Sequence, residues 1–100
     1  GAVGGVMALA AVAPHALHEI VENFAAGALN KAREIQLRLI AANAAVTTGF
    51  GIAGLKESLD LMGMYGGPVR SPLRPLNKSQ RDELEQILKK ALILKKYECR

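Results

Sequence analysis

The residues best suited to bind a metal ion or to move a proton lie near the start of the chain. His15 and His18 are one helical turn apart, and Glu19 and Glu22 follow at similar spacing. Two histidines at this spacing without a third fixed ligand are weak grounds for a metal site. Neither histidine has a nearby candidate nucleophile, because Ser58 falls inside a predicted helix and Cys99 in the C-terminal tail, so a hydrolytic triad is poorly supported. We therefore interpret the cluster as a solvated helix face that holds no metal.

Residues 49–54, GFGIAG, match the glycine pattern of dinucleotide-binding loops. Such a loop needs its glycines between a strand and a helix, so that backbone amides can approach the pyrophosphate, and an acidic residue about 20 positions later. Here a predicted helix precedes the glycines, and the corresponding later position lies in a proline-rich loop without an acid. We expect a glycine-rich join between two helices.

Lys56 is the only lysine in the predicted helix that follows these glycines. A lysine that forms a Schiff base must be desolvated enough to lose its proton near neutral pH. Lys56 falls on the flank of an apolar stripe, and Glu57 and Asp60 lie close enough along the helix to keep its ammonium group charged. We therefore predict a structural role. Arg70 and Arg74 follow in the loop and could bind an anion or exposed helix carbonyls equally well.

The elements that must position these residues are one short strand and four helices. A glycine pair followed by an apolar run is typical of a buried strand over residues 4–10. Apolar residues at helical spacing predict helices at 14–26, 31–47, 52–62 and 78–93. Asn30 is a candidate N-cap for the second helix, and Asn77 with Gln80 makes a capping-box start for the last.

The second helix carries two apolar stripes. The first runs along the whole helix and consists of Ala32, Ile35, Leu39, Ala42 and Val46. The second lies beside it and consists of Leu37, Ile40 and Ala44. Two stripes predict two packing partners, with the alanines allowing close approach, so we expect this helix to be the spine of a bundle.

Length and composition indicate one small domain of packed helices. The chain has 100 residues, of which half are hydrophobic but only four are Phe or Tyr. The net charge of +4 sits largely near the carboxy end, and no aromatic platform accompanies it, so we expect no nucleic-acid partner. A single Cys99 excludes an intrachain disulfide and fits a cytoplasmic or mitochondrial location equally well.

The apolar opening of the chain is too short for a transmembrane helix, which needs about 20 residues, so we expect no membrane partner. A buried parallel strand is the better interpretation, yet the rest of the chain offers no second strand to pair with it. The missing partners predict that this chain is a piece of a larger protein.

Four segments together resemble the C-terminal third of one enzyme family. They are GAVGGVMALA at 1–10, KAREIQLRL at 31–39, FGIAGLK at 50–56 and GGPVRSPL at 66–73. Their order and spacing are similar to those of the dihydrodipicolinate synthase and N-acetylneuraminate lyase family, the Schiff-base pyruvate aldolases. The resemblance implies a (β/α)8 barrel, or TIM barrel, followed by a helical domain. Residues 1–27 would then be its last strand and helix, 28–94 the three-helix domain and 95–100 a tail.

The resemblance also implies where the chemistry lies. The Schiff-base lysine, the proton-relaying tyrosine and the carboxylate-binding threonines of the family belong to earlier strands, and Lys56 and Tyr65 do not match them. Val6 matches the apolar position that lines the pyruvyl group, with Gly5 beside it, and these two residues are the only predicted substrate contacts. The family uses no metal or organic cofactor. Its expected partners are pyruvate or a 2-oxo acid, the remainder of the barrel and further copies of the same protein.

Two points of sequence bear on the branch of the family. Ala11 stands where the family commonly has Asn, so the loop after the strand differs. Residues 50–54 replace the Asn-Pro-x-Pro segment of many bacterial dihydrodipicolinate synthases and look closer to the 4-hydroxy-2-oxoglutarate aldolase-like branch. Alone, such a segment would be inactive because the catalytic lysine is elsewhere. The alternative from a different class is a non-catalytic, self-associating helical module or truncated homologue.

Overall fold

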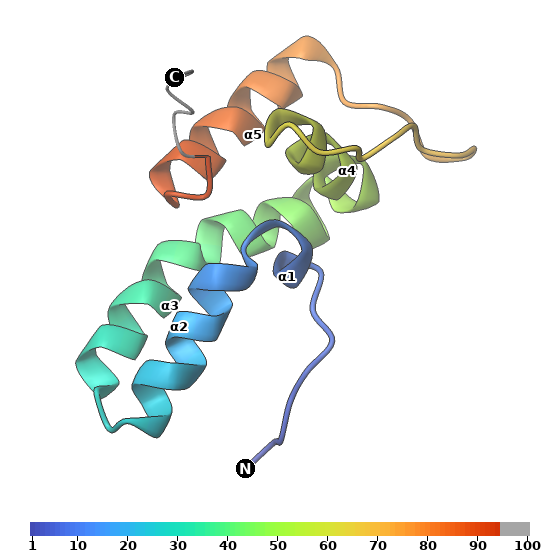
Figure 1. Cartoon of the computed structure of the whole chain (residues 1–100). Coiled ribbons are helices and arrows are strands. Elements are labelled where there is room, and N and C mark those ends of the chain that lie inside the picture. Colours follow the sequence, from blue (N-terminus) through green and yellow to red (C-terminus); the bar gives the residue numbers. More distant parts are fainter. Residues whose placement is uncertain (95–100) are drawn as a thin grey trace.

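A computed structural model describes residues 1–94, and these residues form a helical bundle with an extended N-terminal segment (Figure 1). The predicted tail at 95–100 lies outside the described residues. The elements are α1 (Leu9–Val12), α2 (Pro14–Ala25), α3 (Leu29–Ala44), a π-helical turn η1 (Ala45–Gly49), α4 (Gly51–Leu61) and α5 (Lys78–Lys90). The four predicted helices correspond to α2, α3, α4 and α5, while α1 and the π turn were not expected.

The strand predicted for residues 4–10 is wrong for this chain. The first six residues form no regular structure, and Leu9 begins the single-turn helix α1. Within residues 1–94 no strand is formed, and Figure 1 shows the N-terminal segment running away from the helices. A strand needs a neighbour to satisfy its backbone amides and carbonyls. Because the described residues supply none, the backbone of residues 1–6 stays unpaired, while the carbonyls of Met7 and Ala8 already accept from the first turn of α1.

Helices α2 and α3 lie side by side as an antiparallel hairpin (Figure 1). Gly27, with φ +76°, ends the first helix as predicted, since this left-handed conformation suits glycine. The backbone N–H of Ala28 donates to the carbonyl of Asn23 at 2.8 Å, which closes the turn. Helix α3 therefore begins at once, at Leu29, and the N-cap predicted at Asn30 is wrong because Ala28 occupies the capping position without a side-chain hydrogen bond.

The glycine pattern at 49–54 joins two helices, as predicted. Helix α3 continues into the π turn, in which the N–H of Phe50 donates to the carbonyl of Ala45 at 2.8 Å. A Cβ at Gly54 would lie 2.5 Å from the Cβ of Phe50 and 3.1 Å from the Ala45 carbonyl oxygen. The absence of a side chain at Gly54 thus lets α4 fold closely against the end of α3. This close approach explains why position 54 is glycine, and no nucleotide-binding role is needed to explain it.

The core lies where α1, α3 and α5 meet. Leu84 and Leu88 of α5 are completely buried, and they pack with Leu9 and Val12 of α1. Four residues of the first predicted stripe, Ile35, Leu39, Ala42 and Val46, are buried in the same core, and Ala32 is buried outside it. The core therefore joins residues on both sides of position 27, the domain boundary that we predicted from the family.

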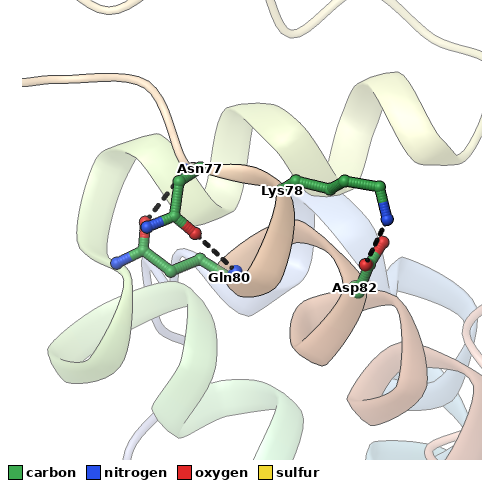
Figure 2. A network of polar contacts seen from close by, with 4 residues as sticks. All are labelled: Asn77, Lys78, Gln80 and Asp82. Atoms are coloured by element: carbon green, nitrogen blue, oxygen red, sulfur yellow. Dashed lines mark hydrogen bonds and ion pairs between the residues drawn. The ribbon is translucent and has the colours of Figure 1, made fainter.

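Helix α5 begins at the predicted capping box, which Figure 2 shows from close by. The N–H of Gln80 donates to Oδ1 of Asn77 at 2.9 Å, and the N–H of Asn77 donates to Oε1 of Gln80 at 3.0 Å. Lys78 and Asp82 add an exposed ion pair of 3.0 Å one turn apart (Figure 2). The box satisfies two of the amides that a helix start leaves free, and so fixes where the proline-rich loop ends.

The second predicted stripe of α3 has no partner among residues 1–94. Leu37 and Ile40 are more than half exposed, and Ala44 is also exposed. Val21 and Phe24 of α2 are exposed to a similar degree. Helix α3 does have two packing partners, because it contacts both α2 and α5, but its second stripe remains largely exposed within the described chain. None of the described helices combines the length and hydropathy that crossing a bilayer requires.

Candidate functional site

The two predicted substrate contacts lie in the unpaired N-terminal segment. Val6 is fully exposed, and Gly5 is approached only by the side chain of Met7. Neither residue lines the cavity at the start of α2 or the smaller one beside Leu17 and Leu39. The predicted contact of Val6 and Gly5 with substrate therefore stays a prediction, because it requires neighbouring strands beside residues 1–6.

A cavity of about 700 Å³ opens between the start of α2 and the far ends of α4 and α5. Its volume falls in the range of small-molecule sites. The walls are apolar except for one side, where His15 and Glu19 of α2 contribute polar groups. The remaining lining residues are Ala11, Val12, Ala13, Pro14, Ala16, Met62, Met64, Ala91, Leu92, Ile93 and Leu94.

The sequence did not reveal this cavity. The sequence singles out His15 and Glu19 only as part of a possible metal cluster, and Met62 falls at the end of the predicted helix at 52–62. The residues that line the cavity come from three stretches that are distant in the sequence. No spacing rule connects such stretches, and only the helix packing brings them together.

The histidine cluster divides between two surroundings. Nε2 of His18 lies 3.1 Å from Oε1 of Glu22, and both side chains are well exposed. His15 and Glu19 line the cavity instead. In the part of the chain that the structure describes, no three His, Cys, Asp or Glu side chains gather closely enough to hold a metal ion. The pairing of His18 with Glu22 agrees with the solvated helix face that we predicted.

Lys56 is held in a structural contact rather than at a reactive site. Its Nζ donates to the carbonyl of Gly66 at 3.0 Å, and the N–H of Gly66 donates to Oδ1 of Asp60 at 2.8 Å. The two side chains, one turn apart on α4, thus hold both backbone groups of one loop residue. This arrangement, which we call the Gly66 clamp, confirms the structural role predicted for Lys56 and fixes the start of the loop that follows α4.

Three arginines offer no assembled anion site within residues 1–94. The side chains of Arg70 and Arg74 form no hydrogen bond or ion pair with described residues, so the suggested contact with helix carbonyls is not formed there, and anion binding is not tested. The Nε of Arg38 is buried without a hydrogen-bond acceptor. By contrast, Arg81 of α5 pairs with Glu57 of α4 at 2.6 Å. The Arg81–Glu57 pair is the one described ion pair that joins two helices, because the other three lie within α2 or α5.

Comparison with known proteins supplies what the geometry alone does not. Residues 1–91 match the model of the dihydrodipicolinate synthetase family. Over 93 residues the chain is 37% identical to the 4-hydroxy-tetrahydrodipicolinate synthase of Caldicellulosiruptor bescii, which is 93% of this chain but 30% of that protein. It is 32% identical over 90 residues to the enzyme of the same name from Brachyspira hyodysenteriae, covering 90% of this chain and 31% of the relative.

A third relative is an uncharacterized DapA-like lyase of Halobacterium salinarum, which is 39% identical over 85 residues, or 85% of this chain and 28% of that protein. The chain spans about 30% of the length of these curated relatives. The family match nevertheless covers nearly the whole chain, so the relationship does not rest on a local motif. The chain belongs to the dihydrodipicolinate synthetase family.

Proposed function

We propose that this chain is the C-terminal segment of a class I pyruvate-dependent aldolase or lyase. Such an enzyme joins pyruvate to an aldehyde, or cleaves a 2-oxo acid, through a lysine imine and without a metal or organic cofactor. Dihydrodipicolinate synthase and 4-hydroxy-2-oxoglutarate aldolase are the two activities that the sequence resembles. The main support for this proposal is the family match over residues 1–91, in a chain about 30% as long as its relatives.

The form of the N-terminal segment supports this proposal. Residues 1–6 are apolar or glycine, extended and unpaired, as expected for a barrel strand without its neighbours. In a barrel, catalysis takes place at the carboxyl ends of the strands, where the following helices begin. Helix α2 begins at Pro14, directly beside the cavity of about 700 Å³. Val6 and Gly5 would then line the pyruvyl pocket, and the cavity would lie near its rim.

The described lysines support a scaffolding role for this segment. A Schiff-base lysine must reach the substrate with an unprotonated amine. Lys56 is committed to the Gly66 carbonyl, and Lys31, Lys78, Lys89 and Lys90 lie on exposed helix positions. The segment would therefore supply one barrel strand, part of the pocket wall and the helical domain, while the preceding part of the polypeptide supplies the reacting lysine. Further copies of the enzyme would complete an oligomer.

Borohydride trapping tests the assignment. The chain is incubated with pyruvate and sodium borohydride, and its intact mass is measured. We expect no adduct on this chain, whereas the complete protein should gain one reduced pyruvyl group on a lysine outside it. Omission of pyruvate is the control. An adduct mapped to Lys56 or to another lysine of this chain would contradict the proposed location of the chemistry.

One observation favours the alternative, a non-catalytic and self-associating helical module. Val21 and Phe24 of α2 and Leu37 and Ile40 of α3 are exposed apolar residues. Exposed apolar surface of this kind marks a site of protein contact, and a second copy of the chain could cover it. The intact mass of the natural protein separates the two functions. A mass near three times that of this chain supports the enzyme, whereas 10.6 kDa supports the module.

A further inference from the structure

The single-turn helix α1 links the unpaired segment at residues 1–6 to the buried core. Leu9 is 4% and Val12 1% exposed, whereas Val3 and Val6, a few residues earlier, are fully exposed. The change from exposure to burial therefore takes place between Val6 and Leu9. Helix α1 marks the point at which the chain becomes fixed to the helical bundle.

Tertiary packing, and not the helix itself, holds α1 in place. A helix of four residues is not stable alone, because its first turn fixes several residues for very few hydrogen bonds. The side chains of Leu9 and Val12 lie in the core with Leu84 and Leu88 of α5, and α2 and α4 also contact α1. The position of α1 is therefore set by the helices that follow it in the chain.

The segment before α1 contains little that could set the register of a strand. Residues 1–8 are Gly, Ala, Val and Met alone, so no polar side chain distinguishes one face from the other. Register is strongly specified where only one face of a strand is apolar, and weakly specified in glycine-rich strands. A slip of one residue would place Gly5 where Val6 belongs and would turn every side chain to the opposite face.

The connection between the segment and α1 has no slack. The carbonyl of Met7 accepts from the N–H of Ala10 at 3.0 Å, and the carbonyl of Ala8 accepts from the N–H of Ala11 at 3.1 Å. Both residues between Val6 and Leu9 are thus already bonded to the turn. A shift of the strand by one residue, about 3.3 Å, would break these bonds or pull Leu9 from the core.

We propose that α1 sets the register of this segment in the complete protein, so that Leu9 and Val12 are positioning residues for the predicted pyruvate contact at Val6. This inference rests on the proposed function. The neighbouring strands supply hydrogen bonds to residues 1–6, and the core contact of α1 determines which residue of the segment faces the substrate. The helical domain thereby acts on the pocket through three residues of chain.

Deletion of Ala8 in the complete protein tests the register. The deletion places Gly5 at the third position before Leu9, where Val6 otherwise stands. Borohydride trapping at increasing pyruvate measures the half-saturating concentration, which should rise by about tenfold because an apolar contact is lost. Adding Gly5→Val to the deletion returns a valine to this position and should restore the half-saturating concentration to within about threefold of the undeleted protein.

Deletion of Gly4 is the matched control, because it removes one residue but leaves Val6 three positions before Leu9. The half-saturating concentration should then change little. If the preceding polypeptide sets the register instead, the Gly4 deletion moves Val6 and the Ala8 deletion does not. An effect of the Gly4 deletion as large as that of the Ala8 deletion, or no rescue by Gly5→Val, overturns the proposal. An undeleted protein that forms no adduct contradicts the proposed function itself.

Hydrogen exchange of the 100-residue chain tests the fixed position of α1 without the deletions. The N–H of Ala13 donates to the carbonyl of Leu9 at 2.9 Å, whereas the amides of residues 2–6 form no hydrogen bond with described residues. The Ala13 amide should exchange more slowly than those amides by about tenfold or more. Equal exchange rates would show that α1 is not fixed, and would overturn the proposal even if the deleted proteins fail to fold.

Discussion

Replacement of Gly66 by alanine tests the most constrained contact of the fold. The φ angle of Gly66 is not in the left-handed region, so alanine would adopt the backbone conformation without strain. The obstacle is instead the Lys56 backbone, because a Cβ at Gly66 would overlap the Lys56 carbonyl oxygen. The loop must therefore move away from α4, and both hydrogen bonds of the Gly66 clamp are lost with it.

The cost follows from the two lost bonds. A hydrogen bond to a charged group contributes about 1.5–3 kcal/mol to stability. The Lys56 bond is partly buried and the Asp60 bond is exposed, so we assign about 1 kcal/mol to each of them. With the repacking of the loop, Gly66→Ala should lower the free energy of unfolding by about 2–3 kcal/mol. Urea unfolding followed by circular dichroism measures this change, with the urea dependence checked for an unaltered slope.

Gly63→Ala is the matched control, because Gly63 has φ +79° but no atom within 4 Å of an added Cβ. It should cost only about 1 kcal/mol, from the left-handed conformation. Lys56→Met keeps the methylene groups and removes the charge. Its destabilisation should largely vanish in the Gly66→Ala background, since the contact is already broken. A smaller loss for Gly66→Ala than for Gly63→Ala, or full additivity with Lys56→Met, would refute the clamp.

Four further substitutions probe the way in which α5 is held. Asn77→Ala removes the side chain that accepts from the Gln80 N–H and should cost about 1 kcal/mol in urea unfolding, with Gln80→Ala costing less. Leu84→Ala leaves a cavity at a fully buried position and should cost about 2–5 kcal/mol by the same measurement. Glu57→Gln breaks the 2.6 Å pair with Arg81, yet should cost no more than about 1 kcal/mol, and the loss should shrink in 1 M NaCl because the pair is partly exposed.

The parts of the fold that the sequence predicted are those whose causes are local. Gly27 ends α2 and the Asn77 capping box starts α5, because the deciding atoms lie within a few residues of each other. The start of α3 was misplaced at Asn30 because the turn before it closes through backbone atoms, which leave no side-chain pattern. The candidate site was less predictable. The cavity depends on how the helices pack, and the clamp depends on how the loop after α4 turns back to it, so neither follows from spacing.

The N-terminal segment is a case in which the deciding contacts are not local. A helix satisfies its own backbone, so the apolar period of α2 or α3 suffices to specify it. A strand takes its hydrogen bonds from other strands, and residues 4–10 carry only the composition of one. If the proposed barrel is correct, the missing neighbours would both pair this backbone and cover fully exposed Val6. The apolar composition of the segment would then be explained by contacts outside this chain, while the buried core of α1, α3 and α5 would hold the helices in place independently of them.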